Sequence, residues 1–571
     1  MSRNEDTGPK SPPPWAGATD DRRAQMFPIL TPEQITELTP FGIESRFASG
    51  ETLWSIGDRD RDFYVVLEGT VDIVHRDPFG RDTVITTYGP GSYSGETAML
   101  TGRGAMVAGR AGTQLRALAV PAAKLRELMV THARLGEVIM RSFILRRMRL
   151  LADRSSDLLV IGSRHIAGTQ HLLEFLTRNG HPYTFTDLET AGDLSALLHG
   201  FEVRIEDTPL VITSNGEPLR NPSLRAVADR LGLSLRRDQQ EVYDAAIVGA
   251  GPAGLASAVY AASEGLDVIV LDPVAPGGQA GTSSKIENYL GFPTGISGQA
   301  LAGRALIQAQ KFGAKILIPA ALTRLHCGNP FHELELDNGE RIRARTVVVA
   351  SGAQYRKPPV EWIDKFEGAG IYYSATYLES QYCRDEEAVV IGGGNSAGQA
   401  AVYLAEGAKK VYLLVRSQGL AATMSQYLIR RIETTPNIEL LNWSEVTALE
   451  GDAGLEAVRW RHVKTGIETR KAVRHLFVFI GATPNTDFLP PNVLTDAKGF
   501  ICTGAEVTRN DHEGLWRLPR APFPLETSCP GIFAAGDVRA TSTKRVASAV
   551  GEGSVTVQYL HQFLAAHGAS P

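Results

Sequence analysis

The chain has 571 residues, of which 43% are hydrophobic, and it carries a net charge of −5 at pH 7 and four cysteines. This length predicts roughly four domains of ordinary size, and the slightly acidic balance argues against a nucleic-acid-binding surface. The sequence shows no signal-peptide core, export signal or membrane anchor, so we expect a cytoplasmic protein that makes no membrane contact. It also shows no cluster of metal ligands, so no metal site is expected.

The N-terminal region begins with a tail and continues as a β-rich domain. Residues 1–25, which include Ser11-Pro12-Pro13-Pro14, predict a flexible tail. Short β-type runs such as Phe63–Leu67 and Val71–His75 then follow one another, separated by Gly and Asp turns. A long helical pattern covers Ala122–Leu151. The spacing predicts a small β-roll with C-terminal helices over residues 26–153.

Two motifs in this domain resemble the cyclic-nucleotide-binding domain of catabolite-activator-type proteins. They are Glu68-Gly69 between two of the strands and the run Gly95–Gly102. In that family a glutamate like Glu96 binds the ribose hydroxyl, and an arginine shortly after it pairs with the cyclic phosphate.

The expected arginine is missing from this chain. Gly104–Met106 stand in its place, and Arg103 or Arg110 would reach a phosphate only if the loop shifted. Because a buried phosphate needs its guanidinium partner, we expect a scaffold or dimerising β-roll that has lost its cyclic nucleotide. No helix-turn-helix follows this domain.

A third unit is predicted over residues 154–238. Its pattern resembles a thioredoxin or glutaredoxin fold, with Thr208-Pro209 at the place of that family's cis-proline. The active-site stretch would fall at Gly162–Gly168, which contains no cysteine, and we expect His165 to be a surface loop residue. The expected elements are strands at 158–161, 183–185 and 208–213, helices at 170–178, 188–198 and 223–231, and a hairpin turn at Asn215-Gly216.

The next apolar run starts at Asp244 and passes through Gly-Ala-Gly-Pro-Ala-Gly into a helix. Gly249 permits the tight turn, Gly251 lets the backbone approach a pyrophosphate, and Gly254 lets the helix pack close to the strand. A second strand ends at Asp272, at the offset expected for a ribose-binding carboxylate. This pattern predicts a dinucleotide site.

A second site of the same kind follows further along the chain. The strand Ala388–Ile391 leads into the turn Gly392–Gly398. Two dinucleotide sites in one chain imply electron transfer between two nucleotides.

From about Tyr243 to Leu564 the chain resembles the low-molecular-weight thioredoxin reductase family. The resemblance implies two Rossmann-like three-layer domains and a homodimer. FAD would bind to residues 239–356 and 486–571, and NADPH or NADH to an inserted domain at 357–485. The further motifs that carry it are Gly277–Gln279, Ile286–Tyr289, Gly291–Pro293, Ala350–Gly352, Gly481–Thr486 and Gly531–Asp537.

The same resemblance implies the cofactor-binding residues. Asp537 would lie near the ribityl and pyrophosphate region of FAD, and Gln279 and Asn288 near its ring or ribityl chain. The residues implied for FAD are Gly249, Gly251, Pro252, Ala253, Gly254, Asp272, Gly278, Gln279, Asn288, Gly352, Gly536, Asp537, Lys544, Arg545 and Val546. Those implied for the nicotinamide nucleotide are Gly392, Gly394, Asn395, Ser396, Ala397 and Arg416.

The chain departs from this family at its redox centre. Ser374 and Tyr377 occupy the positions of the two redox cysteines, and Leu378 that of the acid used in proton transfer. A hydroxyl and a phenol cannot form a disulfide or a flavin adduct. Glu379 either replaces the lost acid or is an exposed helix residue.

The four cysteines of the chain are far apart in the sequence. Two of them could still meet in space, but we expect four unrelated packing thiols in a reducing cytosol. They are Cys327, Cys383, Cys502 and Cys529.

The choice between NADPH and NADH rests on arginines, because a 2′-phosphate needs clustered cations. Only Arg416 is in register with the family's phosphate clamp. Arg430 and Arg431 either add the missing charge or are solvated helix residues. The sequence favours NADPH slightly.

Together these patterns predict a multidomain α/β and α+β flavoenzyme that passes hydride from NAD(P)H to FAD and then electrons to an unidentified acceptor, with a protein redox partner as one option. Three alternatives remain open. They are thioredoxin-disulfide reduction through a substitute thiol such as Cys383, ferredoxin or flavodoxin reduction as in the thioredoxin-reductase-like ferredoxin–NADP reductases, and a redox or ligand sensor with little turnover.

Overall fold

The structure, a computed structural model, describes residues 20–567 except 60, 78–79, 97–98, 100–102, 153–157, 165, 189–206, 214–217, 234–240, 284–285, 287, 364, 368, 374, 376, 422–423, 453 and 511–513. The chain divides into two compact units, residues 1–157 and 158–571. The expected helix at 188–198, the turn at Asn215-Gly216 and the positions of His165 and Ser374 lie outside the described residues.

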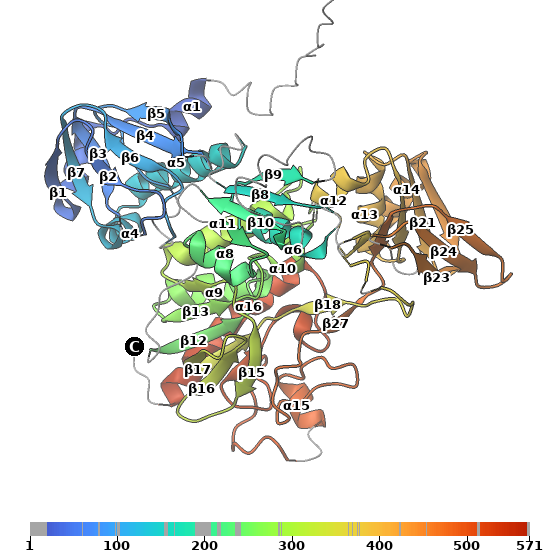
Figure 1. Cartoon of the computed structure of the whole chain (residues 1–571). Helices are drawn as coiled ribbons and strands as arrows, with labels where there is room; N and C mark the ends of the chain where they lie inside the picture. The colour runs from blue at the N-terminus through green and yellow to red at the C-terminus, as the bar shows by residue number, and fades with distance from the viewer. Residues whose placement is uncertain are drawn as a thin grey trace, which may run out of the picture. The chain divides into compact units, whose positions relative to one another are not determined.

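The first unit is a β-roll of two antiparallel sheets with C-terminal helices (Figure 1), as predicted. The sheets have the strand orders β1-β7-β3 and β2-β6-β4-β5. Along β3, Phe63 and Val65 pack with the helices, whereas Tyr64 and Val66 join the core shared by both sheets. The elements are α1 (Asp20–Met26), α2 (Pro32–Leu38), η1 (Thr39–Phe41), β1 (Ile43–Phe47), β2 (Thr52–Trp54), β3 (Phe63–Glu68), β4 (Val71–Arg76), β5 (Asp82–Tyr88), β6 (Ala108–Ala111), β7 (Leu115–Val120), α4 (Ala122–Thr131) and α5 (Ala133–Ala152).

The second unit begins with a four-stranded sheet of order β11-β10-β8-β9. β8 pairs in parallel with β9, and β10 is antiparallel to both β8 and β11. The Thr208-Pro209 peptide that precedes β10 is cis, as expected from the sequence. The elements are β8 (Leu158–Gly162), α6 (Ala167–Arg178), β9 (Thr184–Asp187), β10 (Leu210–Thr213), β11 (Leu219–Arg220) and α8 (Leu224–Arg230).

The next sheet has the order β14-β13-β12-β17-β16-β15, with β28 beside β17. Because side chains alternate along a strand, Ala245 and Ile247 of β12 pack with the helices, while Ala246 and Val248 face the β15–β16 side. The elements are β12 (Val242–Val248), α9 (Pro252–Ser263), β13 (Val268–Leu271), α10 (Gly278–Gly281), α11 (Gly298–Lys311), β14 (Lys315–Leu317), β15 (Leu322–His326), β16 (His332–Leu336), β17 (Arg341–Val349), α15 (Ala505–Asn510), β28 (Ile532–Ala534), η3 (Gly536–Val538) and α16 (Val546–Ala566).

A second parallel sheet, of order β19-β26-β20-β21-β22, is inserted between β17 and β28. The chain enters and leaves the insertion through β18 and β27, which pair with each other. Helices cover one face of this sheet and a three-stranded sheet covers the other. The elements are β18 (Ala353–Tyr355), β19 (Ile371–Tyr372), α12 (Tyr377–Tyr382), β20 (Glu387–Ile391), α13 (Asn395–Ala405), β21 (Lys410–Val415), α14 (Gln426–Thr434), β22 (Ile438–Asn442), β23 (Ser444–Glu450), β24 (Ala457–His462), β25 (Glu468–Lys471), β26 (His475–Val478) and β27 (Ala482–Pro484).

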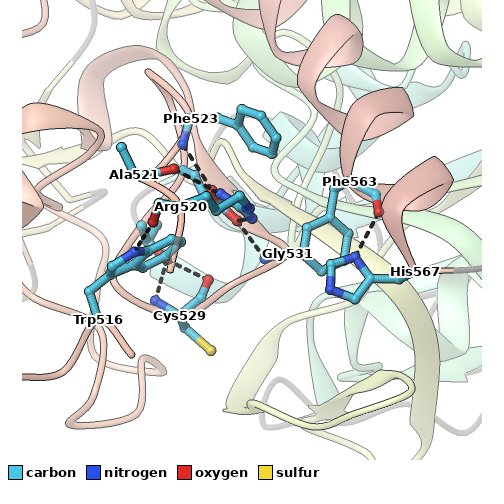
Figure 2. A network of polar contacts seen from close by, with 10 residues as sticks. Trp516, Arg520, Ala521, Phe523, Cys529, Gly531, Phe563 and His567 are labelled. Carbon is cyan, nitrogen blue, oxygen red and sulfur yellow. Dashed lines mark hydrogen bonds and ion pairs between the residues drawn. The ribbon is translucent and has the colours of Figure 1, made fainter. Parts of the chain in front are cut away.

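A buried ion pair fastens the segment before β28 (Figure 2). Arg520 donates to both carboxylate oxygens of Glu526 at 2.6 and 2.8 Å, and the Glu526 side chain is fully buried. The same carboxylate accepts the backbone N–H of Gly531 at 3.1 Å. Losing one partner of such a pair would leave a buried charge uncompensated. The pair therefore fixes the approach to β28, whose carboxyl end leads to Asp537.

Candidate active site

The turn between β12 and α9 is shaped by glycines. Gly249 has φ +104°, and a Cβ there would lie 2.3 Å from the carbonyl oxygen of Ala350. Gly251 caps α9 without a side-chain hydrogen bond, so the first N–H groups of the helix remain available to an anion. A Cβ on Gly251 would meet only the Cα of Gly278, at 3.9 Å. The two glycine backbones thus lie close together beside the N-terminus of α9.

Asp272 follows β13 directly and is held by the backbone. Its carboxylate accepts N–H groups from Ala250 at 2.9 Å, Val274 at 3.0 Å and Ala275 at 2.9 Å. Burial raises the pKa of Asp272, and these three hydrogen bonds together with the charge of Arg178 oppose that rise. A carboxylate oriented in this way can still accept hydrogen bonds from ribose hydroxyls.

One cavity of about 2230 Å³ extends over both glycine turns. Most of the predicted cofactor residues line it, and the large volume suits two dinucleotides. Gly254 and Ala397 are not among the described lining residues. Gly254 packs against its own turn, since a Cβ there would lie 1.9 Å from the carbonyl oxygen of Gly249. Ala397 is fully buried behind the second turn. The predicted residues in the wall are Gly249, Gly251, Pro252, Ala253, Asp272, Gly278, Gln279, Asn288, Gly352, Gly392, Gly394, Asn395, Ser396, Arg416, Gly536, Asp537, Lys544, Arg545 and Val546.

Asp537 reaches the cavity from η3, at the carboxyl end of β28. Burial raises the pKa of its carboxyl group, and Lys544 opposes this shift. Glu552 on α16 accepts the N–H of Gly536 at 2.7 Å and pairs with Arg539 at 2.8 Å. The position of Asp537 thus depends on Glu552, which sequence patterns alone did not indicate.

The second glycine turn repeats the geometry of the first. Gly392 has φ +139°, and Gly394 caps α13 without a side-chain hydrogen bond. Arg416 follows β21 directly and lines the cavity together with Arg461. Arg430 and Arg431 lie on an exposed face of α14 rather than in the cavity wall. Arg416 therefore lies in the cavity wall beside the second glycine turn, and the same wall contains Arg461, which sequence patterns did not indicate.

Helix α12 contains one of the two positions that the family resemblance assigns to the redox cysteines. Ser374 lies outside the described residues, and Tyr377 is the first residue of the helix. Glu379 is half-buried and lines the cavity, so it is not an ordinary exposed helix residue. Cys383 follows α12, is fully buried, and its thiol contacts the carbonyl oxygen of Glu379 at 3.4 Å. Burial raises the pKa of Cys383 to about 12, so the reactive thiolate is scarce at neutral pH.

The expectation of four unrelated thiols is wrong for two of them. Cys327 and Cys529 form a disulfide with a Cα–Cα distance of 6.8 Å across a sequence separation of 202 residues. Cys383 and Cys502 are free and buried. The pairing escaped prediction because it depends on β15 and the segment before β28 lying side by side in the fold. Neither bonded cysteine belongs to the described cavity wall.

The N-terminal domain pairs Glu96 with a residue that the motif did not include. Arg61 reaches Glu96 at 3.3 Å, with the two side chains 4% and 7% exposed. Burial lowers the pKa of Arg61, and Glu96 opposes that shift. The adjoining cavity is about 90 Å³ and is lined by apolar and aromatic side chains such as Trp54 and Ile73 together with Arg61, Glu96, Arg146 and Arg149. It is far smaller than the roughly 300–1,000 Å³ of typical small-molecule sites.

Helix α6 also lines the large cavity. Its residues Gln170, His171, Glu174 and Arg178 join the cavity wall. Sequence patterns predicted this helix but no part for it in a binding site, because helical periodicity does not show which distant surface a helix contacts.

Two further properties concern the part of the chain that the structure describes. In it, no helix has the length and apolar character needed to cross a bilayer. Within the same residues, no group of three or more His, Cys, Asp or Glu side chains could hold a metal ion. The expected absence of metal and membrane contacts stays a prediction.

Two family models and several known proteins are similar to parts of this chain. The family model described as pyridine nucleotide-disulphide oxidoreductase matches residues 243–553, and that of the cyclic nucleotide-binding domain matches residues 44–132. The thioredoxin reductase of Mycoplasmopsis pulmonis is 33% identical over 323 residues, which are 56% of this chain and 97% of that protein. The thioredoxin reductase of Treponema pallidum is 34% identical over 328 residues, 57% of this chain and 96% of that protein.

Two solved structures share the fold of the same region. They are the thioredoxin reductases of Lactococcus lactis and T. acidophilum, with TM-scores of 0.50 and 0.50 and identities of 27% and 28%. Each match covers 57% of this chain and 99% of the other chain. The family model covers more than half of the sequence. The chain therefore belongs to the pyridine nucleotide-disulphide oxidoreductase family, an FAD-dependent enzyme class, and carries an N-terminal cyclic nucleotide-binding domain.

Proposed function

We propose that the protein is an FAD-dependent NAD(P)H oxidoreductase that delivers electrons to an external acceptor without a protein dithiol. Bound FAD would supply hydride acceptance and electron release. The observation that carries the proposal is the pair Ser374 and Tyr377 at the dithiol positions. Cys383, the cysteine nearest to them in sequence, is fully buried with its pKa raised to about 12, which supports the absence of a substitute thiol.

The residues of the chain would bind and orient the two nucleotides. The adjacent backbones of Gly251 and Gly278 would hold the FAD diphosphate, and Asp272 would accept its ribose hydroxyls. Arg416 would bind the 2′-phosphate of NADPH, because a guanidinium matches the charge and geometry of a phosphate. NADPH is therefore the proposed donor, with Arg461 as a second cation at the same cavity.

Anaerobic mixing of the purified protein with NADPH or NADH tests this proposal. We expect NADPH to bleach the flavin absorbance and NADH to do so more slowly. Acceptors are then added one at a time: oxygen, a quinone, a ferredoxin or flavodoxin, and an oxidised thioredoxin. Reoxidation by a non-disulfide acceptor supports the proposal. A protein with bound FAD that neither nucleotide bleaches would overturn it.

Thioredoxin-disulfide reduction is a second candidate, because the relatives that match most of the chain's C-terminal part are thioredoxin reductases. It needs a thiol that reaches both flavin and substrate. The burial of Cys383 speaks against that cysteine as the substitute. Rapid reoxidation by oxidised thioredoxin alone would favour this candidate.

We further propose that residues 158–233 form a thioredoxin-fold domain without redox cysteines. The strand order β11-β10-β8-β9, the parallel β8–β9 pair and the cis-proline before β10 support this assignment. For the N-terminal domain we propose that the cyclic nucleotide has been lost, since Glu96 is paired internally with Arg61 and the adjoining cavity is small. A homodimer is proposed from the family resemblance.

A further inference from the structure

The last turn of α6 is fastened to the loop that follows Asp272. Asn179, just after the helix, donates to the carbonyl oxygen of Val274 at 3.0 Å. Gln299 on α11 donates to the carbonyl oxygen of Thr177 at 2.6 Å. The apolar face of α6 shares one buried core with β12 and α9. These contacts fix the position of α6 relative to the first glycine turn.

Arg178 lies in this fastened turn and faces the same loop. One of its terminal nitrogens donates to the carbonyl oxygen of Gly278 at 3.2 Å, and the other pairs with Glu174 at 3.0 Å. Its Nε is buried and makes no hydrogen bond, and its side chain is only 18% exposed. A guanidinium has five N–H donors, so the two described bonds leave one hydrogen on each terminal nitrogen for a ligand in the cavity that Arg178 lines.

The surroundings of Arg178 indicate which ligand it meets. Arg178 lines the large cavity, and its charge acts on the buried carboxyl group of Asp272. Gly278, whose carbonyl oxygen it contacts, packs against Gly251 at the N-terminus of α9, where the FAD diphosphate is proposed to bind. This helix N-terminus offers backbone N–H groups, which are partial charges, whereas a diphosphate carries full negative charges that a nearby guanidinium compensates. Arg178 is therefore at the diphosphate end of the proposed flavin site.

We propose that Arg178 binds the diphosphate of FAD, so that the 158–233 domain serves as a wall of the flavin site rather than as a redox module. The inference rests on the proposed binding of FAD by this chain. It gives the domain a role that needs no cysteine. It also explains why the cationic end of α6 is held against the loop after β13 and not left in solvent.

Matched variants of the full chain test the proposal. Arg178→Gln removes the charge, and Arg178→Lys keeps the charge but loses the planar fork. Arg225→Gln is the control, because Arg225 on α8 also joins this domain to the flavin-binding part, through Asp337 at 3.3 Å, but is not among the described cavity-lining residues. The FAD of each protein is removed, and the dissociation constants of FAD, ADP and adenosine are measured by calorimetry.

We expect Arg178→Gln to raise the dissociation constants of FAD and ADP by about ten- to a hundredfold, because a charge-assisted hydrogen bond contributes in this range. Adenosine, which has no phosphate, should bind unchanged, and Arg178→Lys should be intermediate. Arg225→Gln should match the wild type for all three ligands. If Arg178→Gln does not fold, the test is the comparison of Arg178→Lys with the wild type. We then expect the affinity for FAD and ADP to fall by about threefold or more in Arg178→Lys.

Three outcomes would overturn the inference. One is unchanged affinity for FAD and ADP in the Arg178 variants. Another is an equal loss for adenosine and ADP, which would indicate a general loss of site structure. The third is an equal loss in Arg225→Gln, which would indicate domain docking alone. A wild-type protein that binds no FAD would instead contradict the proposed function, so the two failures are distinguishable.

Discussion

The two dinucleotide sites share one plan but differ at two corresponding positions. The third glycine of the first turn is Gly254, whereas the second turn has Ala397 there. The residue after the second strand is Asp272 in the first site and Arg416 in the second. Asp272 is buried and bonded to three backbone N–H groups, while Arg416 is exposed at the cavity.

This difference supports the proposed assignment of FAD to the first site and NADPH to the second. A buried carboxylate favours a ribose with free hydroxyls and repels a 2′-phosphate, whereas an exposed arginine attracts one. The close strand–helix packing at Gly254 suits a permanently bound cofactor in a rigid site. An exposed arginine suits a substrate nucleotide that enters and leaves.

The largest expected effect comes from adding a methyl group at the tight turn. Gly254→Ala places a Cβ 1.9 Å from the Gly249 carbonyl oxygen, so backbone must shift. We expect a loss of stability of about 1–3 kcal/mol or more and purified protein without flavin, measured by urea unfolding and the flavin-to-protein absorbance ratio. Ala397→Gly is the matched reverse change and should cost about 0.5–1 kcal/mol while flavin is retained. Equal flavin content in both variants would contradict the expected difference between the two glycine turns.

A smaller effect on flavin binding is expected from Asp272→Ala. Three buried N–H groups would lose their acceptor, each of which costs about 1–3 kcal/mol if no water replaces it. We expect FAD affinity to fall by at least about tenfold, which corresponds to about 1.4 kcal/mol. Fluorescence titration of the flavin-free protein measures it. Wild-type affinity in this variant would show that Asp272 has no part in the flavin site.

Arg416→Ala tests the choice between NADPH and NADH at the second site. We expect KM for NADPH to rise about tenfold, as the loss of one charge-assisted contact predicts, while KM for NADH stays unchanged. Arg430→Ala is the control, since Arg430 lies on an exposed face of α14 outside the described cavity wall. Stopped-flow flavin reduction measures both. An equal rise for the two nucleotides in Arg416→Ala would mean that Arg416 does not contact the 2′-phosphate.

The smallest effect is expected at Cys383. Because its pKa is raised to about 12, roughly one thiol in ten thousand is a thiolate at pH 8. Iodoacetamide should therefore leave Cys383 unmodified in the folded protein, as mass spectrometry of tryptic peptides can check. Cys383→Ala should retain the wild-type rates of flavin reduction and reoxidation. A large loss of disulfide reduction in this variant would restore the substitute-thiol mechanism.

Local patterns were sufficient to predict many of the residues that line the cavity. The glycine turns, Asp272 and Arg416 were predictable because each role depends on neighbours close in the sequence. Arg61, Arg178 and the Cys327–Cys529 disulfide were not, since their partners are 35, 100 and 202 residues away. Ala397 was assigned to the nucleotide because it belongs to the motif, but the helix turns it toward the core.

The central claim is that bound flavin is the sole redox centre in electron transfer. Anaerobic titration of the FAD-loaded protein with dithionite tests it most directly, with thiols counted before and after. We expect one two-electron equivalent per FAD to complete the bleaching and the thiol count to stay constant. The Cys327→Ser/Cys529→Ser double variant should give the same stoichiometry, because neither cysteine is among the described cavity-lining residues. Uptake of two equivalents by the wild type, with two new thiols, would contradict the account.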